Sequence, residues 1–486
     1  MKTLKTSIRL LVIFTLFAIM VSTSCKKDKK ETKSSEKKVL TFQFISVTPA
    51  VTATINEATK SIVADFPVGT NVANMITGIG ISDKATINPA SGVAQNFTNP
   101  INYTVTAEDG STVVYTATVT IGGASPLDPQ TLSGSMSTNQ TLVNRSAGID
   151  YIIDGTFTIS GNALLTIEPG VKILFTGVDG GITVEQNAGL KMVGTAADPI
   201  IFSGPINNPN IGSWYGFEIN SNRADNEFSY VQFINGGSND IYSVINLWGD
   251  AKLKISNCTI SGSLGNGVGL DGASKLTTFT GNTIEKCLKN PVYAYSFESI
   301  MAINATNIFT NNTLNFIHIP GNTGIEYDAT MNALSIPYYF EGGLSFNIAL
   351  TIQEGTTLAF GSSTYLSVND GGKIIANGTP TKRITFTGYS KDPGYWNCIW
   401  IETSLACKFE NCDIEYGGKN TNYGALYIYD TPLITLTNNT FKFSTSYGAS
   451  RMDNTNTGIT AIGNTFNNCV SGNVYNRNVA SISANF

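Results

Sequence analysis

The chain has 486 residues, and only 13% of them are charged, about half the usual quarter. Residues 1–38 hold 10 basic and 3 acidic side chains. The other 448 residues hold 20 basic and 32 acidic side chains, so this larger part has a net charge of −12. A body of that sign repels phosphate backbones, which excludes nucleic acid as a partner. His318 is the one histidine, so a metal site or catalytic triad that needs several histidines is excluded as well.

The N-terminus predicts an exported protein. Three basic residues precede an apolar run over 10–21, and small residues then lead to Cys25. This order is typical of a secretory signal peptide, here residues 1–24, and the apolar run is too short to span a bilayer comfortably. The small residues directly before Cys25 look like the lipobox of a bacterial lipoprotein, in which that cysteine is acylated. The alternative is a plain signal peptide with an incidental cysteine.

The next segment predicts a tether. Residues 26–38 contain no apolar side chain, so residues 25–38 are interpreted as a lipidated, solvated tether. The segment is similar to the charged stretches that follow the lipidated cysteine in surface lipoproteins of the Bacteroidota. The resemblance implies an outer-membrane protein that is anchored in lipid through Cys25 and faces the cell exterior.

Residues 39–123 predict a small all-β module. The segments 39–44 and 61–66 alternate apolar and polar residues, as half-buried strands do. Residues 103–119 predict a hairpin whose turn contains Asp109 and Gly110.

The turn at 67–69, the segment 88–92 and the hairpin resemble the immunoglobulin-like domains that follow the anchor in many Bacteroidota surface lipoproteins. The resemblance implies a β-sandwich that serves as a spacer. A Gly-Gly-Ala-Ser-Pro linker over 122–126 closes the module.

From residue 130 onward, short alternating strands recur with an Asn-containing punctuation. Within each half the intervals run from 25 to 30 residues, about one coil of a parallel β-helix. Asn at one place in each coil predicts a ladder of stacked amides, with the following apolar residue pointing into the core. Propeller and leucine-rich arrays lack their own signatures here. The punctuation occurs at Asn257, Asn282, Asn312, Asn411, Asn439 and Asn464.

The second half of the chain also repeats itself at long range. Residues 165–175 match 350–360, and Trp214 matches Trp396, with similar spacing in between. The pattern predicts a domain over 130–486 with two copies, about 151–335 and 336–486.

This region resembles right-handed parallel β-helix proteins of the pectate-lyase-like class, over about 350 residues. The resemblance implies the fold, a duplicated right-handed parallel β-helix after an immunoglobulin-like β-sandwich, more than it implies a function. The Asn-Thr-Asp, Asp-Asp and Gly-His-Gly signatures of polygalacturonase-like hydrolases are absent, and His318 stands in Phe-Ile-His-Ile-Pro. The few arginines match no lyase motif. Whether the chain is an enzyme stays open, with the balance against it.

Two pairs of carboxylates are the catalytic candidates. Aligning the copies matches Asp250 with Asp430, and the next coil in each half brings their partners Asp271 and Asp453. Coils stack about 4.8 Å apart, so each pair could lie side by side. Such a pair suits a retaining glycosidase or a calcium site. The alternative is that these residues simply form turns.

Exposed aromatic residues are the candidate ligand contacts. Alternation turns Trp248, Tyr427 and Tyr429 outward from their strands, where they could stack on sugar rings. Trp214 and Trp396 are interpreted instead as caps of a hydrophobic seam in both copies.

Six cysteines remain after Cys25, and their spacing fits neither a zinc ribbon nor a dense disulfide scaffold. They are expected to behave as small buried apolar residues. One or two disulfide bridges remain an alternative, and the sequence does not determine which cysteines would pair. They are Cys258, Cys287, Cys398, Cys407, Cys412 and Cys469.

The sequence thus favours a non-catalytic surface lipoprotein that binds polysaccharide or another cell-surface component through its β-helix face. The alternatives are a carbohydrate-active lyase or hydrolase, and a structural surface protein. No cofactor and no metal are expected, apart from calcium between a pair of carboxylates.

Overall fold

The computed structural model describes residues 32–66, 70–121, 129–145, 148–321, 323–429, 433–452, 458–478 and 480–486. The predicted signal peptide, Cys25, the turn at 67–69 and the linker at 122–126 lie outside these residues. The chain divides into two units, Met1–Ser125 and Pro126–Phe486. No helix among the described residues is long and apolar enough to cross a membrane.

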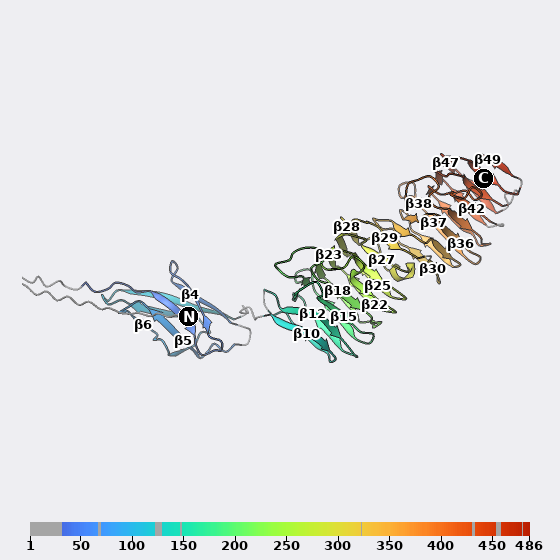
Figure 1. The fold of residues 1–486 in the computed structure, drawn as a ribbon. Helices are drawn as coiled ribbons and strands as arrows, with labels where there is room; N and C mark the ends of the chain where they lie inside the picture. The colour runs from blue at the N-terminus through green and yellow to red at the C-terminus, as the bar shows by residue number, and fades with distance from the viewer. Residues whose placement is uncertain are drawn as a thin grey trace, which may run out of the picture. The chain divides into compact units, whose positions relative to one another are not determined.

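The first unit consists of two sheets that face each other (Figure 1). One sheet has the order β2 (Val51–Thr52), β1 (Val39–Phe44), β5 (Met75–Ile81) and β7 (Ala94–Gln95). The other has the order β3 (Thr54–Asn56), β4 (Ser61–Phe66), β9 (Thr112–Ile121), β8 (Ile101–Thr106) and β6 (Thr86–Asn88).

Aromatic rings from the two sheets meet in the core of this unit. The ring of Phe42 on β1 lies 5.2 Å from that of Tyr103 on β8, and Phe44 lies 5.0 Å from Phe66 on β4. The predicted hairpin is confirmed: β8 and β9 pair antiparallel, and Gly110 in the turn has a φ of 86°, which glycine adopts at low cost.

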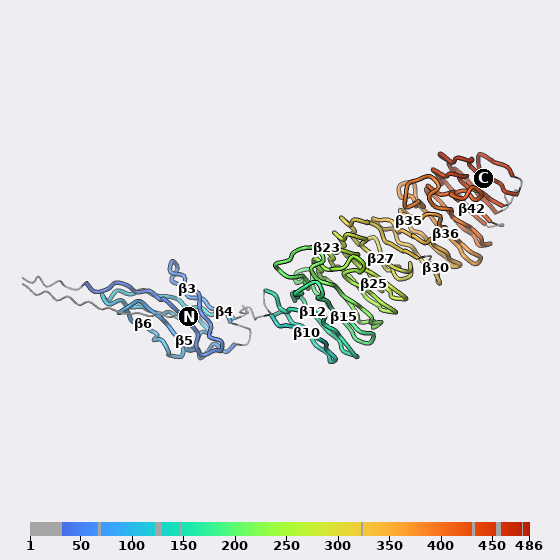
Figure 2. Tube along the Cα trace, in the orientation of Figure 1, coloured from blue at the N-terminus to red at the C-terminus, as the bar shows by residue number. Residues whose placement is uncertain are grey.

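The second unit is a parallel β-solenoid of about 13 turns, whose stacked coils are visible in Figure 2. Its longest sheet begins with β10 (Gln130–Met136) and β12 (Tyr151–Ile159), and the two halves of β12 start two rows of strands. The first row is β14 (Lys172–Phe175), β17 (Ile200–Ser203), β20 (Val231–Ile234), β23 (Thr259–Ser263), β26 (Thr283–Cys287) and β28 (Ile308–Thr310).

The second row, here called the long row, continues to the C-terminal end of the solenoid. It is β15 (Gly181–Val184), β18 (Gly216–Ile219), β21 (Ser243–Leu247), β24 (Asn266–Leu270), β27 (Val292–Ala294), β29 (Ile317–Ile319), β32 (Tyr338–Phe340), β35 (Thr357–Phe360), β38 (Ile384–Gly388), β41 (Cys412–Glu415), β44 (Thr440–Lys442) and β47 (Thr465–Asn467).

Three further sheets complete the coils. A six-stranded sheet is β11 (Gln140–Leu142), β13 (Leu164–Ile167), β16 (Gly189–Val193), β19 (Glu227–Ser229), β22 (Lys252–Ser256) and β25 (Lys275–Thr280). An eight-stranded sheet is β30 (Thr323–Ile325), β33 (Leu344–Phe346), β36 (Tyr365–Val368), β39 (Cys398–Ile401), β42 (Leu426–Ile428), β45 (Tyr447–Arg451), β48 (Gly472–Asn476) and β49 (Ser481–Ser483). The last is β31 (Ala329–Met331), β34 (Ala349–Ile352), β37 (Lys373–Asn377), β40 (Cys407–Glu410), β43 (Ile434–Thr437) and β46 (Ile459–Ile462), and one 3-10 helix, η1 (Phe297–Ile300), precedes β28.

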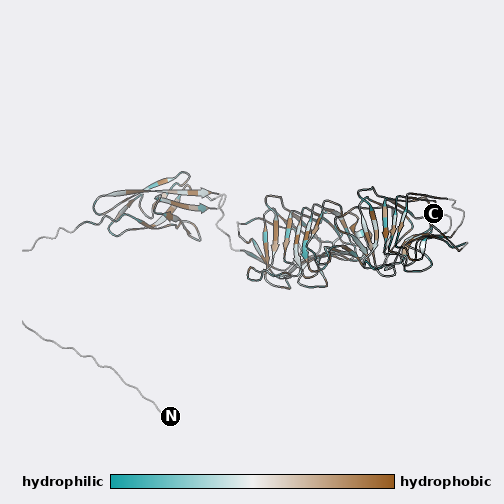
Figure 3. Ribbon diagram, turned by 90° about the horizontal axis from the view of Figure 1, so that it is seen from above, coloured by the Kyte–Doolittle hydropathy of each residue, from teal (hydrophilic) through white to brown (hydrophobic). Residues whose placement is uncertain are grey.

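Side-chain alternation along each strand separates core from surface. In the long row, Ile245, Val268, Val292 and Ile317 follow one another in register and are all fully buried. Figure 3 shows brown, hydrophobic segments along the stacked strands. The residue after each of them points outward, so the long row also presents a column of outward side chains.

The predicted amide ladder is present, and it is buried. The side chain of Asn282 accepts a hydrogen bond from Cys258 N and donates one to Asn307 Oδ1 at 3.0 Å. The same pattern joins Cys412, Asn439 and Asn464 in the second half.

Two of the expected ladder positions have another role. Asn257 and Asn411 have φ values of 53° and 48°, which Asn tolerates better than most residues. Both residues form a turn of the chain. In the next coils, the residue that directly follows the equivalent turn position is the one that forms the ladder. Asn307, which lacks the Asn-Thr pattern, was missed. Asn312 accepts a separate bond from Cys287 N.

The segments that match in sequence do not take the same place in the solenoid. β14, in residues 165–175, belongs to the first row, whereas β35, in residues 350–360, belongs to the long row. The chain therefore passes through a non-integral number of coils between them.

Candidate functional site

The outward column of the long row contains a gap at Gly269. Asn246, Gly269 and Tyr293 follow one another in the register of β21, β24 and β27. Since glycine has no side chain, a hollow of about 160 Å³ opens over β24. A Cβ atom at this position would lie 2.5 Å from Ser243 Oγ, so any larger residue would force the Ser243 side chain to move. We call this feature the Gly269 hollow.

Aromatic side chains form the walls of the Gly269 hollow. Trp248 and Asp271 come one residue after the paired Leu247 and Leu270, and Tyr295 lies one coil further on. The ring of Tyr242 lies 5.9 Å from that of Trp248, and the rings of Tyr293 and Tyr295 lie 5.8 Å apart. Tyr295 is 52% exposed, and Trp248 is half-buried. The hollow therefore offers aromatic surface on both sides.

Asp271 is the one charged side chain that lines the hollow. Its Oδ1 accepts a hydrogen bond from Gly272 N at 2.6 Å, and its other oxygen has no partner among the described residues. Burial raises the pKa of Tyr293 to about 12, and the nearby Tyr295 and Asp271 act in the same direction. The Tyr293 hydroxyl thus stays protonated and remains a hydrogen-bond donor at neutral pH.

Asn246 is fixed by its own strand and is not directed at a ligand. Its Oδ1 accepts a bond from Ser243 N at 2.9 Å, and its Nδ2 donates to Ser243 O at 2.8 Å. Its role is to hold the edge of the hollow in place.

Further aromatic residues continue the column beyond the hollow. His318 and Tyr339 follow Tyr293 in register, and their rings stack at 5.2 Å. Tyr389 stacks on Tyr339 at 4.4 Å, and the edge of Phe316 packs against both. We call Tyr293, Phe316, His318, Tyr339 and Tyr389 the aromatic row.

His318 lies within this row as a neutral side chain. Burial lowers the pKa of His318, although the carboxylate of Glu341, 2.9 Å from Nε2, acts in the opposite direction. The imidazole is enclosed by Tyr293, Phe316 and Tyr339.

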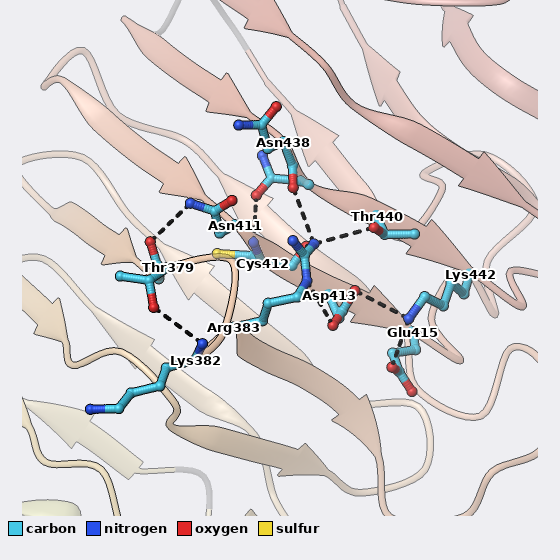
Figure 4. A network of polar contacts seen from close by, with 12 residues as sticks. Thr379, Lys382, Arg383, Asn411, Cys412, Asp413, Glu415, Asn438, Thr440 and Lys442 are labelled. Atoms are coloured by element: carbon cyan, nitrogen blue, oxygen red, sulfur yellow. Dashed lines mark hydrogen bonds and ion pairs between the residues drawn. The ribbon is translucent and has the colours of Figure 1, made fainter.

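A charged network occupies the C-terminal part of the long row (Figure 4). Arg383 Nε donates to Asp413 Oδ2 at 3.0 Å, and its Nη2 donates to Cys412 O and to Thr440 Oγ1. Lys442 Nζ lies 3.1 Å from Asp413 Oδ1 and 3.6 Å from a carboxylate oxygen of Glu415. Because these charges are paired across consecutive coils, the network stabilises the stack and leaves no unpaired cation in it.

The predicted pair Asp250 and Asp271 does not share one cavity. The register of Leu247 with Leu270 places Asp271 opposite Trp248, and Asp250 lies two residues beyond Trp248, in the turn that follows β21. Asp250 Oδ2 accepts a bond from Asn222 Nδ2 at 2.6 Å and lines a separate shallow depression on the other side of Trp248. The candidates Asp430 and Asp453 lie outside the described residues.

The expectation that Tyr427 is exposed is wrong. Its side chain is 1% exposed, because Trp400, Tyr423 and Arg477 cover it, and Arg477 Nη1 donates to its hydroxyl at 2.6 Å. Tyr429 is 37% exposed at the edge of this cluster. The cluster lies on the eight-stranded sheet, whereas Trp248 follows a strand of the long row.

The six described cysteines are free thiols, five of them buried and Cys469 half-buried. Burial raises the pKa of Cys258, Cys287 and Cys412 to about 12. No group of three or more His, Cys, Asp or Glu side chains in the described part of the chain is arranged to hold a metal ion.

Sequence reasoning missed Gly269, Tyr242, Tyr293 and Tyr295. The alternation in Val292-Tyr-Ala-Tyr295 would have turned both tyrosines outward. The hollow itself depends on the register of three coils, which the spacing of motifs does not provide.

Two family models match parts of the chain. Residues 39–119 match the model described as "SGBP, N-terminal", the N-terminal domain of surface glycan-binding proteins of the Bacteroidota. Residues 134–241 match the model described as "Pectate-lyase like beta helix domain". No curated protein matches the chain.

Among solved structures, one match is a proposed glycoside hydrolase from Bacteroides thetaiotaomicron, with 27% identity and a TM-score of 0.17. The match covers 21% of this chain and 32% of the other, so this chain spans about a third of that protein's length. A second is a proposed secreted protein from Bacteroides fragilis, with 17% identity and a TM-score of 0.15, covering 18% of this chain and 95% of the other.

Proposed function

We propose that this chain is a lipid-anchored protein of the cell surface that binds glycan at the Gly269 hollow and does not cleave it. The observation that carries this proposal is the aromatic lining of the hollow by Tyr242, Trp248, Tyr293 and Tyr295, with Asp271 as a hydrogen-bond acceptor. Sugar rings stack on aromatic faces, and a few polar groups fix their orientation.

The family matches support the same function. The model matched by residues 39–119 is named for surface glycan-binding proteins. We propose that this first unit is an immunoglobulin-like spacer, and that the right-handed parallel β-helix after it presents the binding site. We also propose that residues 151–335 and 336–486 are two copies of one ancestral segment, since Trp214 and Trp396 make matching contacts.

The anchor is a separate part of the proposal. We propose that residues 1–24 are removed, that Cys25 is acylated, and that residues 25–38 hold the protein away from the outer membrane. Phase partition in a cloud-point detergent tests this in the native host. The wild type is expected in the detergent phase and Cys25→Ser in the aqueous phase, and equal partition of the two would refute the anchor.

The enzyme alternative has less support at this site. Glycoside hydrolysis generally needs two carboxyl groups that flank one bond, and Asp271 is the one carboxylate that lines the hollow. Release of reducing ends from polysaccharides, with calcium present, tests this alternative. New reducing ends that disappear in Asp271→Asn would make the chain an enzyme, and no release from any bound glycan would support binding alone.

The decisive experiment for binding compares Trp248→Ala with Trp400→Ala by affinity electrophoresis and calorimetry on a polysaccharide panel. Both tryptophans are half-buried. Trp248 directly follows a strand of the long row, whereas Trp400 lies in a strand of the eight-stranded sheet. We expect at least a tenfold loss of affinity in Trp248→Ala and little change in Trp400→Ala. If no glycan retards the wild-type protein, a structural role becomes the better interpretation.

A further inference from the structure

The aromatic row extends the Gly269 hollow along the axis of the solenoid. From β24 the long row passes through β27, β29, β32 and β35 to β38, at the end of which Tyr389 stands. The ring of Tyr389 stacks back on Tyr339 of β32, so the path from Gly269 to that ring covers four steps of about 4.8 Å, roughly 19 Å. An extended sugar chain advances by a similar distance per residue, so its rings could follow the coils one by one.

The accessible parts of the row are placed to contact such a chain. Tyr295, beside Tyr293 in the wall of the hollow, is 52% exposed and Tyr389 at the far end is 45% exposed, whereas Tyr339 is only 8% exposed. Tyr339 serves as the support on which Tyr389 stacks, and the half-buried Phe316 packs beside them. A stacked support holds an exposed ring in one orientation, which reduces the entropy lost on binding.

The charged side chains that line the hollow or contact the row are carboxylates. Asp271 lines the hollow and Glu341 stands beside His318. Lys391, at the Tyr389 end, donates to Thr387 Oγ1 at 2.7 Å and to Gly388 O, and Lys289 lies 3.9 Å from a carboxylate oxygen of Asp240. A uronic acid or sulfated sugar would meet these two carboxylates, and no cation is among the residues that line the hollow or form the row.

We infer that the ligand is a neutral polysaccharide whose chain lies parallel to the solenoid axis, from the Gly269 hollow to Tyr389. This inference rests on the proposed glycan binding and adds the chemical class, the direction of the chain and the far end of its site. The hollow alone would hold a short oligosaccharide, and the aromatic row adds affinity only for longer ones.

The test uses gluco-, xylo- and manno-oligosaccharides of three and six units with wild-type protein, Tyr389→Ala and a control, Tyr327→Ala. Tyr327 is 42% exposed, close to Tyr389 in exposure, and it contacts Lys275 away from the row. We expect Tyr389→Ala to weaken hexasaccharide binding about tenfold and to leave trisaccharide binding unchanged, with no effect of Tyr327→Ala. If Tyr389→Ala unfolds, as circular dichroism would reveal, Phe316→Ala replaces it in the same comparison.

Three outcomes are distinct from one another. The extended site is wrong if Trp248→Ala abolishes hexasaccharide binding but Tyr389→Ala binds trisaccharides and hexasaccharides as tightly as the wild type does. If carboxymethylated or uronic oligosaccharides bind as tightly as neutral ones of the same length, the neutral class is wrong. If no oligosaccharide of either class binds the wild type, the proposed function itself fails.

Discussion

Trp214 and Trp396 make the same two contacts in distant parts of the chain. The indole N–H of Trp214 donates to Ile234 O and that of Trp396 to Glu415 O, both at 2.8 Å. The rings stack on Phe175 and Phe360 at 4.5 Å and 4.6 Å. Both tryptophans are fully buried. Their role is therefore structural, and each closes a seam between neighbouring coils.

Replacing Trp396 with Phe is expected to destabilise the solenoid by about 2 kcal/mol, because it leaves a cavity and an unpaired carbonyl oxygen. Chemical denaturation followed by circular dichroism measures the change. Trp400→Phe, at a half-buried position, serves as the control and should cost less. Equal costs at the two positions would contradict the structural role of Trp396.

The amide ladder predicts a second stability effect. The Asn439 side chain is fully buried, accepts from Cys412 N, and donates to Phe409 O and Asn464 Oδ1. Asn439→Ala should destabilise the protein by about 2–4 kcal/mol, since several buried polar groups lose their partners. Asn207→Ala, at an exposed position, is the matched control. A loss of stability no larger than in the control would show that the ladder contributes little.

The buried thiols predict slow chemical modification. In a Cys25→Ser variant of the native protein, we expect at most one thiol to react quickly with a disulfide reagent, namely the half-buried Cys469. The other five should react only after denaturant is added, because burial keeps them protonated and inaccessible. A reducing agent should leave the melting temperature unchanged. A lower melting temperature in reductant would instead indicate a disulfide.

The neutral His318 predicts a pH dependence of stability. Burial lowers the pKa of His318 in the folded protein below its ordinary value of 6.5, so the unfolded chain binds a proton more readily. The contribution of this residue is present above the unfolded pKa and is lost as pH falls below about 6.5. The melting temperature should fall more between pH 7 and pH 5 in wild type than in His318→Gln. Parallel curves for the two proteins would contradict this assignment.

Local patterns predicted the strands and the repeating coil. Alternation in residues 39–44 and 61–66 gave the bounds of β1 and β4 correctly, because one face of each strand must be buried. The Asn punctuation predicted a ladder at Asn282, Asn439 and Asn464, and the structure places the ladder there.

Features that depend on contacts between coils could not be predicted. Alternation turns Tyr427 outward, yet it does not show that Trp400 and Arg477 cover the ring from other coils. The spacing of Asp250 and Asp271 suggested adjacent carboxylates, but the register of the strands shifts them by two residues. The register of the strands decides which side chains are neighbours across a sheet. A single sequence gives only indirect information about that register.

The last strand of the eight-stranded sheet runs against the direction of the others. β49 pairs antiparallel with β48, whereas every other strand pairing within the described part of the solenoid is parallel. An open parallel edge would be a template for the first coil of another molecule, and stacking of that kind leads to end-to-end polymerisation. A reversed strand at this edge opposes that growth along the eight-stranded sheet.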